Sequence, residues 1–150
     1  MGRPGGDVTH RSLDGVRVRL TGPHDLGRPC TSVARIADRG RLHEISSGTR
    51  ADALSWADDI GVDRFDEEFR IQDGRLRVGR TETHDPDTGQ RDPVLAAMWE
   101  GRRHAVFTHL YHARPADAVA FFGTVRLAEH DDGIVAVPRG RARRPEPAEL

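Results

Sequence analysis

Four short segments have a glycine near their start, followed by residues that tend to alternate between apolar and polar. Alternation of this kind predicts a half-buried strand, and an Asp-Gly pair supplies the positive φ angle that a tight hairpin turn requires. We therefore expect a turn and then a strand in each segment. The segments are LDGVRVRL at 13–20, ADRGRLHEI at 37–45, QDGRLRVGR at 72–80 and DDGIVAVP at 131–138.

Three of these segments have a matching strand on the other side of their turn. Because an antiparallel pair needs only a short connection, each match predicts a β-hairpin. The irregular spacing of the hairpins along the chain argues against a repeat architecture. The predicted hairpins join residues 33–37 to 42–45, 68–71 to 76–78, and 125–129 to 134–137.

Three short amphipathic helices are predicted between the hairpins. Thr49 and Asp52 form a possible capping box for a helix over 50–60, which a glycine ends. Helices over 93–101 and 115–123 each open with proline and close with glycine, the residues favoured at those two positions. Hairpins interleaved with short helices predict an α+β fold, with a mainly antiparallel sheet of β-hairpins and about three short helices.

The length and composition suit one domain. A chain of 150 residues, 36% of them hydrophobic, can bury about two-thirds of the surface that its unfolded form exposes. We expect a single α+β domain over 13–138, a flexible N-terminal arm over 1–12 and a polar C-terminal tail over 139–150. Since no run of 18 or more apolar residues and no apolar leader is present, we expect a soluble, cytoplasmic protein without membrane contact.

The basic residues and the single cysteine exclude several classes of enzyme. All 23 basic residues are arginine, because the sequence contains no lysine. Such a chain cannot form a lysine Schiff base with pyridoxal phosphate or a carbonyl substrate, nor a phosphate-binding loop of the G-x-x-x-x-G-K type. Cys30 alone cannot form an internal disulfide or a C-x-x-C motif. We expect no cofactor.

The stretch HAVFTHLYHARP, residues 104–115, places His109 and His112 three residues apart. Residues at this spacing share a face on a helix but point to opposite faces of a strand. The β-forming residues between 106 and 111 favour a strand, which would prevent the two imidazoles from binding one ion. The alternative is a metal-dependent hydrolase in which the ion activates water. Its ligands would be His109, His112, His130 and Asp131, with His84 and Asp132 nearby.

Arginine alternates with aliphatic residues in two predicted strands, Arg17 and Arg19 in one, Arg75 and Arg77 in the other. If these strands are neighbours, their outer face is an arginine patch; otherwise each carries solvated, locally balanced charges. Guanidinium groups pair with carboxylate or phosphate, so the patch would suit an acidic protein surface or a nucleic-acid backbone. The tail would add Arg139, Arg141, Arg143 and Arg144.

These observations favour a non-enzymatic interaction or assembly module, a structural subunit or adaptor of a larger complex, for example a multisubunit particle or a phage-like assembly. Its partner would be another protein or a second copy of the chain. Binding of nucleic acid by an arginine-rich regulatory module is a less favoured alternative. The net charge of −1 predicts no global attraction to nucleic acid, and few aromatic residues are present for base stacking.

Overall fold

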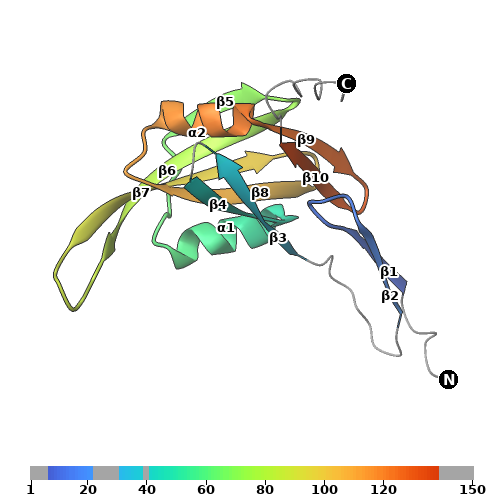
Figure 1. The fold of residues 1–150 in the computed structure, drawn as a ribbon, viewed down its shortest axis with the longest axis horizontal. Coiled ribbons are helices and arrows are strands. Elements are labelled where there is room, and N and C mark those ends of the chain that lie inside the picture. Colours follow the sequence, from blue (N-terminus) through green and yellow to red (C-terminus); the bar gives the residue numbers. More distant parts are fainter. Residues whose placement is uncertain (1–6, 22–30, 39–40, 139–150) are drawn as a thin grey trace, which may run out of the picture.

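A computed structural model describes residues 7–21, 31–38 and 41–138 of the chain (Figure 1). A six-stranded antiparallel sheet forms the centre, with the strand order β3-β4-β8-β7-β6-β5, and two further pairs of strands, β1-β2 and β9-β10, form small sheets. The elements are β1 (Asp7–Arg11), β2 (Arg17–Thr21), β3 (Ser32–Asp38), β4 (Arg41–Thr49), α1 (Arg50–Asp59), β5 (Glu67–Ile71), β6 (Gly74–His84), β7 (Arg91–Glu100), β8 (His104–Tyr111), α2 (Pro115–Gly123), β9 (Val125–His130) and β10 (Gly133–Pro138).

The fold class predicted from the sequence is confirmed. The three predicted hairpins are the antiparallel pairs β3–β4, β5–β6 and β9–β10. Two of the three predicted helices are also present, as α1 and α2. At the start of α1 the capping box forms as expected: the Thr49 side chain accepts a hydrogen bond from the Asp52 backbone N–H, and the Asp52 carboxylate accepts one from the Thr49 N–H.

The predicted helix over 93–101 is wrong, because these residues belong to the central strand β7. This strand pairs with β6 on one side and β8 on the other, and every residue from 94 to 100 is buried. A strand covered on both faces has a continuous apolar run, which does not differ in periodicity from a buried helix. Gly101 ends the strand rather than a helix, and its N–H donates to the carbonyl of His104 in the turn that follows.

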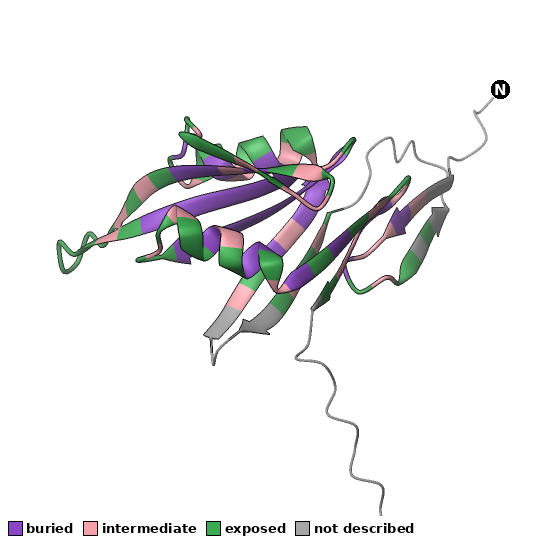
Figure 2. Ribbon diagram, turned by 90° about the horizontal axis from the view of Figure 1, so that it is seen from above, coloured by how far each residue is buried: buried purple, intermediate pink, exposed green. Residues whose placement is uncertain are grey.

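The two faces of the large sheet bury separate hydrophobic clusters. On one face Leu95 and Trp99 of β7 pack with Phe121 and Phe122 of α2 and with the β9–β10 hairpin. The other face packs against α1 through a smaller cluster that contains Met98. Figure 2 shows the buried positions concentrated along the central strands. The sheet therefore forms a middle layer, with α1 on one side and α2 with β9–β10 on the other (Figure 1).

The hairpin β1–β2 is joined to β9–β10 by hydrogen bonds. The Arg11 N–H donates to the Asp132 carbonyl over 2.9 Å, and the Ala136 N–H donates to the Leu13 carbonyl over 2.8 Å. Strand β1 lies within the segment that the sequence assigned to an N-terminal arm. The predicted tail over 139–150 lies outside the described residues. Within the described part, no helix is long and apolar enough to cross a membrane.

Candidate functional site

His109 and His112 have different neighbours in the structure. His109 lies within β8, as the strand interpretation predicts, and its ring contacts Tyr111 edge-on with centroids 5.6 Å apart. His112 follows the strand with a φ angle of 52°, and its Nε2 lies 3.1 Å from Oδ1 of Asp92. Each imidazole therefore has its own neighbour.

The other predicted metal ligands lie on the β9–β10 hairpin. His130 ends β9 and Asp131 begins the turn. Among residues 7–21, 31–38 and 41–138, no group of three or more histidine, cysteine, aspartate or glutamate side chains is arranged to hold a metal ion. The described residues thus provide no assembled centre for the hydrolase hypothesis.

The two arginine-bearing strands are not neighbours. Strand β2 belongs to the small sheet with β1, whereas β6 lies in the six-stranded sheet, so the four arginines do not form one patch. Arg17 instead binds Asp132 over 3.3 Å, beside Arg11, whose Nε lies 3.0 Å from the same carboxylate. The predicted tail arginines Arg139, Arg141, Arg143 and Arg144 lie outside the described residues.

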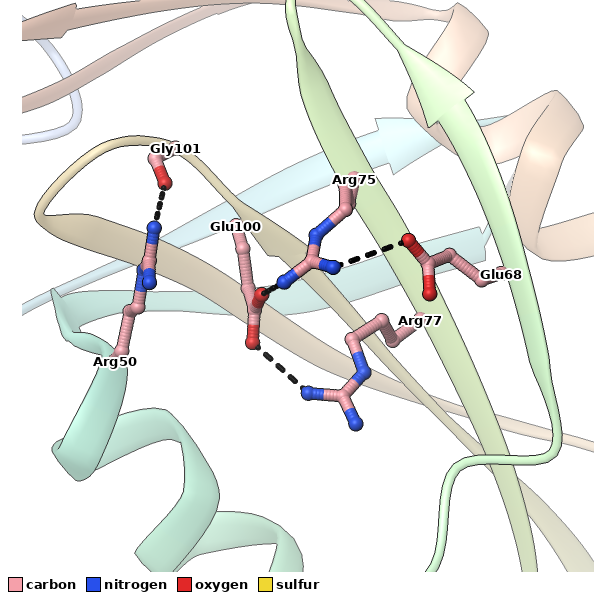
Figure 3. Close-up of polar contacts among 6 residues, drawn as sticks. All are labelled: Arg50, Glu68, Arg75, Arg77, Glu100 and Gly101. Atoms are coloured by element: carbon pink, nitrogen blue, oxygen red, sulfur yellow. Dashed lines mark hydrogen bonds and ion pairs between the residues drawn. The ribbon is translucent and has the colours of Figure 1, made fainter.

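Arg75 and Arg77 do lie side by side on β6, where they share one buried carboxylate (Figure 3). Arg75 donates to Oε2 of Glu100 over 3.0 Å, and Arg77 donates to Oε1 over 3.2 Å. Only 4% of the Glu100 side chain is exposed, against 47% for Arg75 and 33% for Arg77. Cross-strand register explains the contact, because Glu100 of β7 lies directly opposite Arg75. The buried carboxylate thus holds both guanidinium groups in place.

Further charged side chains surround this pair. Arg75 also donates to Glu68 of β5 over 3.3 Å. Arg50 at the start of α1 donates to the Gly101 carbonyl over 2.8 Å (Figure 3). We call Arg50, Glu68, Arg70, Arg75, Arg77 and Glu100 together the arginine face. Four positive and two negative side chains give it a formal charge of +2.

Arg70 is the unbalanced member of the arginine face. It lies on β5 directly opposite Arg75, is exposed, and forms no ion pair with any residue in the described ranges. Like charges directly opposite each other on neighbouring strands destabilise a sheet. The arginine face therefore has an uncompensated positive position at its outer edge, where an anionic group would relieve the repulsion.

A shallow groove adjoins the arginine face beside α1. Its volume is about 440 Å³, and its lining includes Leu54, Val62, Phe65 and Arg77. The Arg77 guanidinium stacks over the Phe65 ring, 5.0 Å from its centroid. Stacking holds the guanidinium plane while leaving its edge donors available for hydrogen bonds. The groove thus combines apolar side chains with charges of both signs, because Asp58, Asp63 and Arg64 also line it.

A second polar cluster lies between β1, β8 and the β9–β10 hairpin. The Glu129 carboxylate accepts hydrogen bonds from the backbone N–H groups of residues 102–104 and from Nδ1 of His104, at 2.6 to 3.0 Å. Burial alone would raise the pKa of Glu129, but these hydrogen bonds together lower it below 4.5. The carboxylate therefore stays charged and ties β9 to the β7–β8 turn.

His10 of β1 lies beside this cluster and is only 5% exposed. Neither ring nitrogen has a hydrogen-bond partner among the described residues. Burial lowers the pKa of His10 below 6.5, Asp132 opposes this shift and His104 adds to it. For Asp132 itself, burial would raise the pKa, but the hydrogen bond and charge of Arg11 lower it overall. The imidazole is therefore held neutral next to an ionised carboxylate.

Sequence reasoning missed His10 and Glu100 as members of polar clusters. The sequence did contain a signal for Glu100, which is a charged residue at the end of an apolar run. A hairpin of β6 and β7 that turns near residue 87 places Glu100 opposite Arg75. No comparable signal existed for His10, which lies in a segment without apolar alternation.

Comparison of the chain with models of protein families, with curated proteins and with solved structures finds no match. The functional argument consequently depends on the geometry of the arginine face and its surroundings.

Proposed function

We propose that the chain is a non-enzymatic interaction module that binds an acidic protein surface through its arginine face. In this role it would act as an adaptor or structural subunit of a larger assembly in the cytoplasm. The observation that carries the proposal is the cross-strand pair of Arg70 and Arg75, two like charges of which only Arg75 is neutralised by described carboxylates.

The arrangement of Arg75 and Arg77 supports the same function. Side chains that are already ordered lose less conformational entropy when a partner binds, so the contact is stronger than one made by freely moving arginines. Glu100 and Phe65 provide this ordering, and the half-exposed guanidinium groups keep donors that face solvent. Carboxylates are suitable partners, because the arginine fork matches their planar geometry.

The coverage of the sheet also leaves this surface accessible. Helix α1 packs against β4, β7 and β8, so it covers the middle of its face of the sheet. The arginine face on β5 and β6 lies beside that helix and carries exposed charges. A partner can therefore reach the arginine face and the groove at the same time.

Binding of a fluorescent poly-glutamate peptide, measured by anisotropy at low salt, tests the proposal. We expect Arg70→Gln to weaken binding by about two- to fivefold, the range for an exposed ion pair. Arg126→Gln is the matched control, because Arg126 is exposed on β9 in the hairpin that packs against the opposite face. Equal affinities of the two variants would contradict the proposal. Tighter binding of a DNA duplex at the same salt concentration would favour the nucleic-acid alternative.

A further inference from the structure

The far end of the β6–β7 hairpin extends beyond the rest of the fold (Figure 1). Residues 81–90, with the sequence TETHDPDTGQ, are partly or fully exposed. They include Glu82, Asp85 and Asp87 but no arginine, so their formal charge is −3. We call residues 81–90 the acidic tip.

The acidic tip has an ordered turn. The Asp85 carboxylate accepts hydrogen bonds from the backbone N–H groups of Asp87 and Thr88, at 2.8 and 3.4 Å. Gly89 adopts a φ angle of 71°, and its N–H donates to the Asp85 carbonyl over 2.8 Å. Asp87 is consequently presented to solvent by a defined backbone, and its carboxylate makes no hydrogen bond or ion pair with the described residues.

The acidic tip and the arginine face occupy opposite ends of one hairpin. Arg75 lies opposite Glu100 at the near end of β6 and β7, and His84 lies opposite Arg91 at the far end. At about 3.3 Å per residue, the nine steps from Arg75 to His84 span about 30 Å. The rigid strands between them prevent the tip from reaching the arginine face of its own chain.

We propose that the acidic tip of one copy of the chain docks on the arginine face of a second copy. This inference rests on the proposed function and identifies the acidic partner as the chain itself. In this contact Asp87 faces Arg70 and the exposed donors of Arg75 and Arg77. The contact joins two different surfaces, so it is repeated along a row of subunits, either as an open filament or as a closed ring.

The charges on the two surfaces determine how the association behaves. Exposed ion pairs are individually weak and screened by salt, so we expect reversible association that rises with protein concentration. Raising the salt concentration from about 0.05 M to about 0.5 M should weaken it roughly tenfold, because the screening length falls below the size of the contact.

Charge exchange between the two surfaces provides the decisive experiment, read by sedimentation velocity of the full chain. Arg70→Glu changes the formal charge of the arginine face from +2 to 0, and Asp87→Arg changes that of the acidic tip from −3 to −1. Each variant also places like charges opposite each other where Arg70 and Asp87 would meet. Both side chains are exposed and lack described partners, so circular dichroism should confirm unchanged folding. Each variant alone should remain monomeric at concentrations where the unchanged chain associates.

An equimolar mixture of the two variants should associate again, since the unaltered acidic tip of Arg70→Glu then meets the unaltered arginine face of Asp87→Arg. Arg126→Glu, which reverses an equivalent charge outside both surfaces, should associate like the unchanged chain. The inference is overturned if the unchanged chain stays monomeric at low salt, if either variant still associates alone, or if the mixture does not. If such a result is found but the chain still binds poly-glutamate, the proposed function is retained. Only the identification of a second copy as the partner is then wrong.

Discussion

Nδ1 of His104 lies 3.0 Å from Oε2 of Glu129, the carboxylate that also closes the β7–β8 turn. Three backbone N–H groups point at the same two oxygens, so four donors converge on one side chain. A carboxylate is required here because it only accepts hydrogen bonds, whereas an amide would direct its own N–H groups at some of these donors.

Replacing Glu129 by glutamine should therefore destabilise the fold. We expect the free energy of unfolding to fall by about 1–3 kcal/mol, the usual cost of leaving buried or charge-assisted donors unsatisfied. Urea denaturation followed by tryptophan fluorescence measures this change. Glu82→Gln is the control, because its side chain is 60% exposed and its ion pair with Arg91 is long, at 3.9 Å. Equal stabilities of the two variants would show that the four hydrogen bonds contribute little.

His10 should make the fold sensitive to mild acid. Its pKa is lowered in the folded state, mainly by burial, so the unfolded chain binds a proton at a higher pH than the folded chain does. The unfolded state therefore gains protons first as the pH falls below about 6.5, and the stability present above that pH is progressively lost. Asp132 and Glu129, whose pKa values are also lowered, extend the loss to lower pH.

Urea denaturation at several pH values between about 5 and 8 tests this prediction. His10→Phe should remove most of the slope above pH 5, because the ring keeps a similar shape but cannot titrate. His84→Gln is the control for replacing a histidine, since His84 is exposed at the acidic tip. A steep slope that persists in His10→Phe would assign the acid sensitivity to other groups.

Gly74 should not tolerate even a methyl group. A Cβ atom at this position would overlap the Trp99 ring and lie 2.6 Å from the Glu100 carbonyl oxygen. The Trp99 ring cannot move away freely, because its Nε1 donates to the Ile71 carbonyl over 2.8 Å. We expect Gly74→Ala to destabilise the fold by about 1–3 kcal/mol through overpacking.

Thermal unfolding followed by circular dichroism measures this effect. Gly123→Ala is the matched control, because a Cβ atom there would meet no other atom within 4 Å. That variant should be neutral or slightly more stable, since alanine is favoured over glycine at the end of a helix with ordinary φ. A lower midpoint for both variants would indicate a general effect of replacing glycine.

The hairpins and caps of this fold were predictable because their signals are local. The turn at Gly133 and the Thr49 capping box each depend on residues a few positions apart. Strand β7 was not predictable as a strand. The helices α1 and α2 cover its two faces and β6 and β8 flank it, and the sequence does not show where these elements lie. For the same reason, the sequence did not show that Arg17 and Arg75 lie apart. Their strands have similar sequences but belong to different sheets.

The candidate site was predictable only in part. Arg75 and Arg77 were identified by their alternation with aliphatic residues, a local pattern. Arg70 gives the arginine face an uncompensated charge, and Glu100 orders its guanidinium groups. Both side chains lie next to Arg75 because of cross-strand register, which is not a local pattern. The strand around His109 was expected correctly, because the β-forming residues between 106 and 111 determine the local conformation.

Glu100 is expected to stabilise the sheet through its two charge-assisted hydrogen bonds. Glu100→Gln removes the negative charge while keeping the side-chain shape, and it leaves Arg75 and Arg77 close together without compensation. Breaking a buried ion pair from one side is costly, but the exposed parts of both arginines remain hydrated. We therefore expect a loss of about 1–3 kcal/mol in the free energy of unfolding, measured by urea denaturation.

Glu68→Gln provides the comparison for Glu100→Gln, because Glu68 binds the same Arg75 but is 49% exposed. Its removal should cost less than about 1 kcal/mol, as for other exposed ion pairs. The difference between the two losses of stability should widen in high salt, since solvent ions screen the exposed pair more than the buried one. If the two variants lose equal stability, burial of Glu100 does not strengthen its contacts, and the arginine face is held in place by Phe65 and the strand backbone instead.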